Sequence, residues 1–374
     1  MVPMRFAHIT ILFFSILLFE SPLFSAQNIK NNIYYSEEYE KRLMSAIDNL
    51  FDRKYEEALE DFKALEKIDP NSPMGKFGQS ALYQMRMVEE EDFAFEKEYR
   101  KVAKEAQEII KKKIDSGKAD AWIYLISGSS YGLDGLLEAR KKSWWDVIKK
   151  GYTGLTHIQK AKELDPTLYE ADLGIGLYEY FRSKLSEKYS FLPFFEDVKN
   201  QGIKRILNAI GKAHFTEYAS YLCLCFVYLV EKNPNKLLEY AAKIENKYPN
   251  NLIAKIFIAR GHREKKEYDQ AETMLKKALE IHKDYAIAHL NLGYLYQYQL
   301  KKKSEYASQA LSHYIKVTKI TKSTSLISTA YYNMSKIYEY QKKDSQAEFY
   351  LNKASKLNPE FTKNTKKKVK TFGL

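Results

Sequence analysis

Apolar residues recur along most of this chain at spacings of three and four residues, in segments separated by short polar breaks. Residues 55–68 place Ala58, Phe62 and Leu65 in this pattern before Asp69 and Pro70 end it. Such spacing puts apolar side chains on one face of a helix, and proline does not fit a helix interior. The pattern therefore predicts an all-α chain made of paired amphipathic helices.

Residues 328–361 show the pattern most completely. With Ser328 as position 1, large residues stand at positions 4, 7, 11 and 24, small residues at 8, 20 and 27, and proline at 32. The residues concerned are Tyr331, Met334, Tyr338, Leu351, Ser335, Ala347, Ala354 and Pro359. This spacing resembles the tetratricopeptide repeat, a helix-turn-helix unit of about 34 residues. The resemblance implies a right-handed superhelical solenoid, in which each unit contacts only its neighbours.

About eight such units fit the chain when the same spacing is applied throughout. Units one to four occupy residues 39–213, and units five to eight occupy residues 214–361. Small residues at positions 8, 20 and 27 are expected where helices cross most closely, so that larger side chains would not fit. They include Gly174, Ala259, Ala271, Gly293, Ala347 and Ala354. The low content of Gly (15) and Pro (9) agrees with a continuous helical array.

The second unit is irregular. We expect one helix over residues 74–88 and a longer one over residues 93–114. The acidic run Glu89-Glu90-Glu91-Asp92 is expected at the start of that second helix, where the helix dipole favours negative charge.

Units three and four are each lengthened by an insert, at about residues 133–149 and 184–199, and the helix after the first insert is expected to begin at Gly151. Both inserts are rich in aromatic residues, and Trp144, Trp145, Phe194 and Phe195 are candidates for contact. A large ring contributes ~1.5 to 3 kcal/mol only when it is buried. The inserts therefore either pack on the array, which we favour, or dock on a partner or membrane surface.

The N-terminus resembles an export signal. Arg5 precedes an apolar run over residues 9–19, and small residues at Ser25 and Ala26 suit cleavage. The run is shorter than the roughly 20 residues that span a bilayer. We expect a signal peptide over residues 1–26, followed by a polar segment over residues 27–38, although an uncleaved anchor is the alternative. This interpretation predicts a bacterial protein of the periplasm or associated with the outer membrane.

Charge is distributed unevenly. Residues 1–200 hold 29 basic and 33 acidic residues and have a net charge of −4, whereas residues 201–374 hold 31 and 15 and have a net charge of +16. Residues 362–374 form a basic tail. An acidic protein, an anionic glycan or a lipid headgroup surface could bind the basic half, or its lysines could simply solvate helix faces.

No pattern of catalytic or metal-binding residues emerges from the sequence. The seven His residues are scattered, and no glycine-rich phosphate loop or nucleophile motif is present. Cys223 and Cys225 lie two residues apart, so on a helix they point away from each other and cannot form a disulfide with each other. We therefore expect no enzyme activity, no cofactor, no metal and no nucleic-acid partner, and the oligomeric state is open.

The resemblance implies a concave groove lined by the first helix of each unit. Transferring the groove positions of the family predicts a partner-binding surface of Tyr178, Tyr218, Tyr221, Tyr228, Ile256, Arg260, Arg263, Asn291, Tyr294, Tyr332, Asn333 and Lys336. Tyr and Arg often anchor interfaces because they combine a large area with a polar end. We expect a non-enzymatic scaffold of the cell envelope that binds a peptide or helix there; the alternative is a peripheral binder of an anionic glycan or lipid surface.

Overall fold

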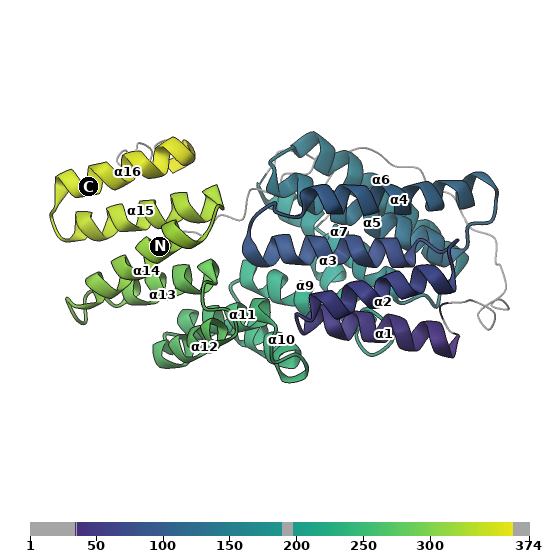
Figure 1. Cartoon of the computed structure of the whole chain (residues 1–374), viewed down its shortest axis with the longest axis horizontal. Helices are drawn as coiled ribbons and strands as arrows, with labels where there is room; N and C mark the ends of the chain where they lie inside the picture. Colours follow the sequence, from purple (N-terminus) through teal and green to yellow (C-terminus); the bar gives the residue numbers. More distant parts are fainter. Residues whose placement is uncertain (1–33, 35, 189–196, 362–374) are drawn as a thin grey trace. The chain divides into compact units, whose positions relative to one another are not determined.

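The computed structural model describes residue 34 and residues 36–188 and 197–361, with only the backbone described for residues 185–188. Within these ranges the chain forms sixteen α-helices and no strand (Figure 1), so the all-α prediction is confirmed. The predicted signal peptide (1–26), the basic tail (362–374), Phe194 and Phe195 lie outside the described residues.

Two groups of helices follow each other along the chain. The first is α1 (Glu37–Phe51), α2 (Tyr55–Ile68), α3 (Met74–Glu90), α4 (Glu96–Asp115), α5 (Ala121–Arg140), α6 (Trp144–Leu164), α7 (Glu170–Lys188), α8 (Lys199–Ala209) and α9 (Glu217–Val230). The second is α10 (Pro234–Lys247), α11 (Leu252–Glu264), α12 (Tyr268–Ile281), α13 (Ala286–Tyr298), α14 (Tyr306–Ile320), α15 (Thr324–Tyr340) and α16 (Asp344–Leu357).

The helices belong to two compact units. The N-terminal unit contains the chain up to Met85 together with Phe95–Leu224, and the C-terminal unit contains Arg86–Ala94 together with the chain from Cys225 onward. The boundaries therefore fall inside α3 and α9, whereas the repeat count placed a division at residue 213. The first part of α9 belongs to the N-terminal unit because Tyr218 packs edge-on against Phe51 of α1, with ring centroids 6.4 Å apart.

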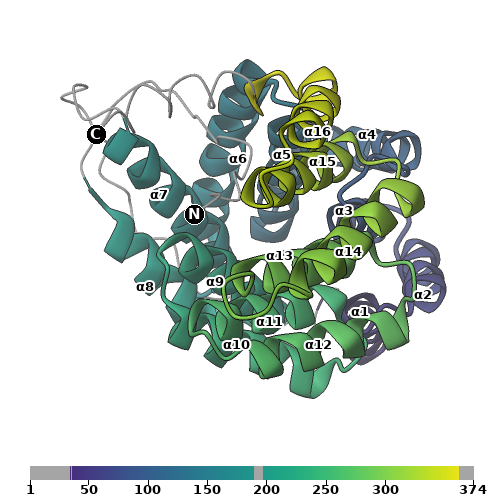
Figure 2. The ribbon, with the colours of Figure 1, turned by 90° about the vertical axis from the view of Figure 1, so that its left-hand side faces the viewer.

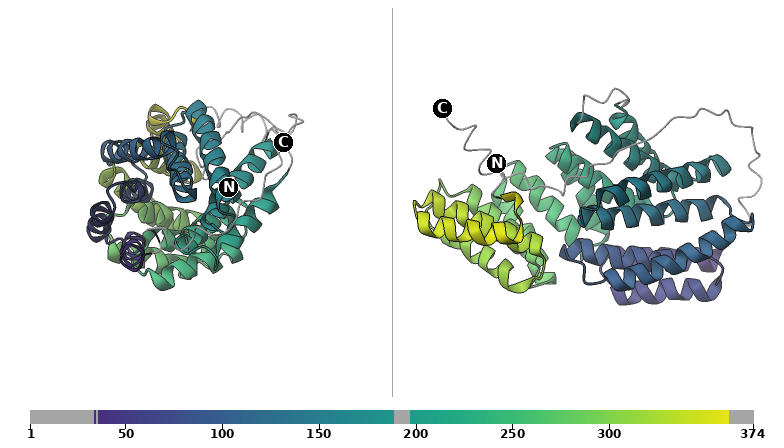
Figure 3. Two further views of the ribbon diagram at one scale, coloured as in Figure 1. Left: turned by 90° about the vertical axis from the view of Figure 1, so that its right-hand side faces the viewer. Right: turned by 90° about the horizontal axis from the view of Figure 1, so that it is seen from above.

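Consecutive helices form packed pairs, as the repeat spacing predicts. In the C-terminal unit α11 packs on α12, α13 on α14 and α15 on α16 (Figures 2 and 3). The first helices of these pairs, α11, α13 and α15, also contact one another in sequence order. Ala271, Leu275 and Ala278 of α12 are fully buried at their expected positions. Gly293 of α13 lies against the ring of Tyr314, and a Cβ atom there would be 2.4 Å from that ring.

Five of these pairs are joined by the same left-handed turn. The second residue after the first helix has positive φ at Arg53 (62°), Lys142 (62°), Lys232 (54°), Lys266 (64°) and Lys342 (59°). The next amide then donates to the carbonyl five residues earlier, as in Lys54 to Asn49 (2.8 Å) and Lys343 to Tyr338 (2.9 Å). This geometry satisfies carbonyls that would otherwise lack a partner at the helix end. The chain therefore uses a basic residue where glycine is the more common choice.

The first insert is helical rather than a loop. Its residues lengthen α5 and α6 to 20 and 21 residues, so α6 begins at Trp144 and not at Gly151 as we expected. The turn between them is short because Lys142 adopts the left-handed conformation. The second insert in part lengthens α7 to Lys188, and residues 189–196 lie outside the described ranges.

Two other expectations need correction. Ala347 is only half-buried, because α16 is the last described helix and no further described helix covers this side. The segment expected to be polar, residues 27–38, contributes Tyr34 to the core of the N-terminal unit. The Tyr34 hydroxyl lies 3.0 Å from Ser72 Oγ, and its ring centroid lies 4.9 Å from that of Trp122. The Tyr34 ring is therefore buried against Trp122 at the start of α5.

The acidic run of the second unit also lies elsewhere than expected. Glu89 and Glu90 end α3, and Glu91 and Asp92 belong to the turn that precedes α4. The run therefore stands at the C-terminal end of a helix, where the helix dipole disfavours negative charge, and not at an N-terminal end. Something other than the dipole must compensate these carboxylates.

Candidate functional site

The strongest candidate site lies on α11, α13 and α15 of the C-terminal unit. Arg260 and Arg263 of α11 both reach Asn291 of α13, with Arg260 Nε 3.4 Å and Arg263 Nη1 3.5 Å from Asn291 Oδ1. Asn291 is held in place because its Nδ2 donates to the Ile287 carbonyl oxygen at 2.7 Å. Three residues that the sequence predicted separately are thus brought together. We call them, together with Tyr294 of α13 and Asn333 of α15, the arginine groove, after the groove that the repeat resemblance implies; Arg260, Asn291, Tyr294 and Asn333 are buried in the structure.

Burial shapes the electrostatics of the arginine groove. Arg260 is 8% exposed, and burial together with the adjacent Arg263 guanidinium lowers the pKa of Arg260 to about 10. Burial raises the pKa of Tyr294 to about 12, so its hydroxyl is neutral at physiological pH. The Arg263 guanidinium lies over the rings of Tyr294 and Tyr298, 5.8 Å and 5.5 Å from their centroids. The site therefore concentrates positive charge where water is largely excluded.

Two polar atoms in the arginine groove have no partner. Arg263 Nε and Asn333 Oδ1 are both buried without a hydrogen bond. Asn333 is fully buried, and its Nδ2 donates to the Thr329 carbonyl oxygen at 2.7 Å. A buried polar atom without a partner costs roughly 1 to 3 kcal/mol. Such atoms suit a ligand that brings both a donor and an acceptor, as a peptide backbone does.

The acidic segment 86–94, which comprises the last turn of α3 and the residues that follow it, contacts the same part of the C-terminal unit. Glu91 Oε1 accepts a hydrogen bond from Ser325 Oγ of α15 at 2.7 Å, and Glu90 Oε1 lies 3.3 Å from His282 Nε2. Burial lowers the pKa of Arg260 and raises that of Tyr294, and the negative charge of Glu91 opposes the first shift and adds to the second. The sequence did not predict the contact between Glu91 and Ser325, although the acidic run of residues 89–92 is evident in it.

The other predicted groove residues are spread over both units. Tyr178 is half-buried on α7, while Tyr218 and Tyr221 of α9 pack edge-on, 5.5 Å apart, in the N-terminal unit. Tyr228 stacks on Tyr240 at 5.7 Å in the C-terminal unit, where Ile256 of α11 is also buried. These tyrosines serve core packing as well as the surface.

Two predicted residues lie on the last pair. Tyr332 of α15 stacks on Phe361 with ring centroids 4.7 Å apart, and the Lys336 ammonium lies 5.6 Å from the centroid of the Tyr332 ring. Lys336 Nζ also donates to Glu339 Oε2. Both side chains are half-buried, and because they flank Asn333 in the sequence of α15 we refer to them as the rim of the arginine groove.

The insert tryptophans differ from each other. Trp144 is half-buried at the start of α6, but Trp145 is 83% exposed. The packing that we favoured for the inserts therefore does not apply to Trp145. One face of α6 is turned toward α5, and Trp145, the next residue after Trp144, points away from that face.

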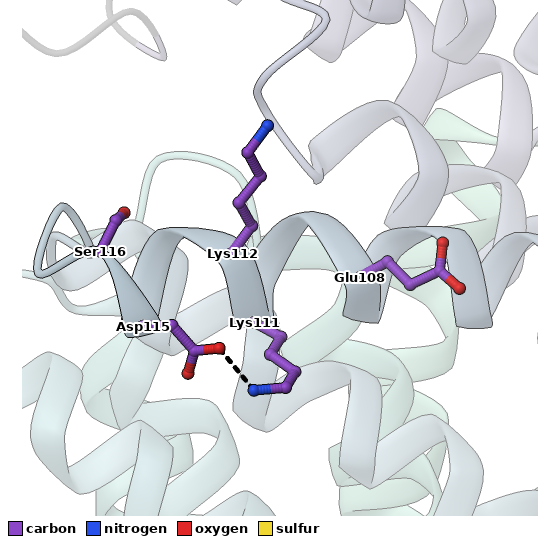
Figure 4. Close-up of a pocket in the computed structure, with 5 residues that line it drawn as sticks. All are labelled: Glu108, Lys111, Lys112, Asp115 and Ser116. Atoms are coloured by element: carbon purple, nitrogen blue, oxygen red, sulfur yellow. Dashed lines mark hydrogen bonds and ion pairs between the residues drawn. The ribbon is translucent and has the colours of Figure 1, made fainter.

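Other features of the described ranges carry no comparable arrangement. A hollow on the surface of α4 is lined by Glu108, Lys111, Lys112, Asp115 and Ser116, and Lys111 pairs with Asp115 along the helix (Figure 4). Within the described ranges no three His, Cys, Asp or Glu side chains gather to hold a metal ion. No described helix is both long and apolar enough to cross a membrane.

The two cysteines are free thiols, as their spacing predicted. Burial raises the pKa of Cys223 to about 12, and Cys225 is fully buried. A thiol that stays protonated is a poor nucleophile and a poor metal ligand. We therefore assign both residues to packing.

A histidine pair lies between α13 and α14. His289 Nδ1 is 3.0 Å from His313 Nδ1, and His289 Nε2 donates to the Lys283 carbonyl oxygen at 3.3 Å. Burial and the neighbouring His289 lower the pKa of His313 to about 4, and burial lowers the pKa of His289. Glu272, Lys276, Asp284 and Lys316 are the charged groups around the pair.

The pair predicts acid sensitivity of the C-terminal unit. Both pKa values are depressed, so the folded chain keeps both rings neutral while the unfolded chain takes up protons near pH 6.5. Stability is therefore complete above about pH 6.5 and falls toward pH 4, by up to roughly 1.4 kcal/mol per pH unit for each ring. Urea unfolding at pH 7.5 and pH 5 measures this loss. His313→Phe should reduce it, and an equal loss in that variant would contradict the assignment.

Comparison with known proteins agrees with the geometry. The tetratricopeptide repeat family matches residues 328–361. A chain of the APC/C hetero-tetramer Cut9-Hcn1 superposes with a TM-score of 0.58 at 15% identity, covering 88% of this chain and 54% of that one. This chain thus spans about half the length of that relative. Human IFIT1, solved as a dimer with PPP-AAAA, gives a TM-score of 0.46 at 15% identity over 84% of this chain and 71% of its own, and no conclusion rests on it. No curated protein matches the chain in sequence.

Proposed function

We propose that this chain, which matches the tetratricopeptide repeat family over residues 328–361, is a non-enzymatic scaffold of the bacterial cell envelope that binds a segment of another protein in the arginine groove. One observation carries the proposal: α11, α13 and α15 bring Arg260, Arg263 and Asn291 together and leave Arg263 Nε and Asn333 Oδ1 without partners. A ligand that accepts from Arg263 Nε and donates to Asn333 Oδ1 would pair both atoms.

The chemistry of the site fits an extended peptide or helix. Tyr294 and Tyr298 supply ring faces, and the two arginines supply donors for carbonyl or carboxylate oxygens. Large aromatic and Arg side chains in desolvated positions contribute most of the binding energy at protein interfaces. The predicted export signal supports the envelope as the place where the partner is met.

Site-specific crosslinking in intact cells tests this function. A photoreactive amino acid replaces Tyr332 at the rim of the arginine groove or, as a control, Phe349, which is 52% exposed on α16. We expect one defined adduct from position 332 and none from position 349. Arg263→Ala in the same chain should reduce the adduct by more than about tenfold, because hot-spot residues are worth ~2 kcal/mol or more.

The same experiment distinguishes binding to a protein partner from the alternative, binding to an anionic glycan or lipid surface. Lys353→Ala removes one positive charge from α16 and serves as the matched control for Arg263→Ala. Equal adducts in both variants, together with retention on anionic vesicles that falls steeply with salt, would favour surface binding through the basic half. Recovery of the protein only in the cytoplasmic fraction would contradict the envelope assignment.

A further inference from the structure

The left-handed turn residue after α3 departs from the rest of the chain. In the described ranges six non-glycine residues have positive φ, and five of them are Lys or Arg. The sixth is Glu91, with φ of 52°. Its turn is otherwise the same, because the Asp92 amide donates to the Met87 carbonyl oxygen at 3.1 Å as the other turns do. All six turns share this backbone conformation, but the side chain at Glu91 is negative whereas the other five are positive.

This reversal is unfavourable within the turn itself. The C-terminal end of a helix carries a partial negative charge, and a cation there is worth about 0.3 to 1 kcal/mol while an anion has the opposite effect. Lys or Arg at the five other turns complements the dipole. Glu91, preceded by Glu89 and Glu90 and followed by Asp92, opposes it. Its stabilisation must come from outside α3.

The groups that interact with this acidic run come from the C-terminal end of α12, from α15 and from the arginine groove of the C-terminal unit. Ser325 Oγ donates to Glu91 Oε1, His282 lies beside Glu90, and the charge of Glu91 acts on the buried Arg260. Arg263 has an ion-pair partner in Glu264, with Nη2 3.2 Å from Oε1, but in the described ranges no carboxylate oxygen lies within ion-pair distance of Arg260. The charge of Glu91 therefore acts on Arg260 without forming an ion pair with it.

We propose that the turn of residues 86–94 is an internal stand-in for the partner, and that the partner is an acidic segment whose carboxylate displaces Glu91 and pairs with Arg260. This inference rests on the proposed function and adds the chemical class of the ligand. An incoming carboxylate at hydrogen-bonding distance satisfies a buried guanidinium better than Glu91 does. The resting protein has its groove occupied, and binding requires exchange of one acidic segment for another.

The internal segment competes strongly because it is tethered. A segment on a short connection reaches an effective concentration of the order of millimolar, so an external peptide of similar affinity binds poorly until the tethered one is expelled. Glu91→Lys expels it by placing a second cation near Arg260. The turn itself tolerates this change, because lysine already occupies the equivalent position at Lys142, Lys232, Lys266 and Lys342.

The probe is a fluorescein-labelled peptide with the sequence of residues 86–94, added to the purified mature chain. Fluorescence anisotropy should show binding to Glu91→Lys at least about tenfold tighter than to the wild type. Glu98→Lys, the same charge change at an exposed residue of α4, should bind as weakly as the wild type. A peptide with Gln in place of Glu89, Glu90 and Glu91 should not bind, and Arg260→Met combined with Glu91→Lys should abolish binding.

A second measurement guards against misfolding. Hydrogen exchange of the amides in residues 86–94 should be faster in Glu91→Lys than in the wild type, while amides of α13 and α15 keep their protection. Equal affinity of wild type and Glu91→Lys for the peptide, or unchanged exchange in residues 86–94, overturns the inference. Peptide binding as expected without any crosslinked partner in cells would instead leave this inference standing and contradict the proposed function. A partner adduct in cells whose amount does not change in Glu91→Lys would support the proposed function and contradict this inference.

Discussion

Gly176→Ala is expected to destabilise the N-terminal unit by about 3 kcal/mol, among the largest effects available in this chain. A Cβ atom at Gly176 of α7 would lie 2.6 Å from the carbonyl oxygen of Gly202 in α8. The approach is reciprocal, because a Cβ atom at Gly202 would lie 2.6 Å from the Gly176 carbonyl oxygen. The obstacle is backbone on both helices, so no side-chain rotation can relieve it, and α7 and α8 must separate.

Gly132→Ala provides the matched control. Gly132 is an exposed residue inside α5, and no atom lies within 4 Å of the Cβ position there. Alanine should therefore stabilise α5 by about 0.5 to 1 kcal/mol through its higher helix propensity. Urea unfolding followed by circular dichroism measures both variants. If the two substitutions shift the midpoint in the same direction, close packing of α7 on α8 is not what Gly176 provides.

Asp134→Ala is expected to cost about 3 kcal/mol, because Asp134 joins three helices in the N-terminal unit. Its Oδ1 accepts from the Tyr99 hydroxyl of α4 at 2.6 Å, and its Oδ2 accepts from Lys150 Nζ of α6 at 2.6 Å. Asp134 is 7% exposed, and burial together with the adjacent Asp134 carboxylate raises the pKa of Tyr99. Alanine would leave a buried hydroxyl and a mostly buried ammonium group without their acceptor.

Asp134→Asn distinguishes charge from hydrogen bonding at this position. Its amide oxygen still accepts one hydrogen bond, so the loss should be about half that of alanine. Chemical denaturation of the three proteins at pH 7 gives the comparison. The assignment of Asp134 as a central acceptor would be wrong if alanine were as stable as asparagine.

The spacing of small and large residues predicted most of the helix pairs because each repeat position has one packing environment. Ala259, Ala271, Ala278 and Ala354 are buried where the repeat requires small residues. Gly174 was placed by the same rule, but it faces Ile158 of α6, whereas Gly176 of α7 meets Gly202 of α8. Gly174 and Gly176 lie two residues apart in α7. The crossing angle of the helices decides which of them lies at the closest contact, and the spacing does not specify that angle.

The site was predictable only in part for a related reason. Arg260, Arg263, Asn291, Tyr294 and Asn333 occupy groove positions that the repeat register identifies one helix at a time. Glu91 comes from a different unit of the repeat, about 170 residues away from Arg260 in sequence. Its position in a turn that otherwise carries Lys or Arg was a signal in the sequence, but its meaning required the backbone conformation of all six turns.

By itself the sequence determined that this protein is a stack of helix pairs, because apolar spacing fixes which face of each helix is buried. The repeat register also predicted which first-helix side chains face a groove. Only the tertiary structure decided that residues 86–94 join the C-terminal unit, that Arg260 is buried without an ion-pair partner in the described ranges, and that Trp145 is exposed. These properties arise from contacts between residues distant in the chain, and no local spacing encodes them.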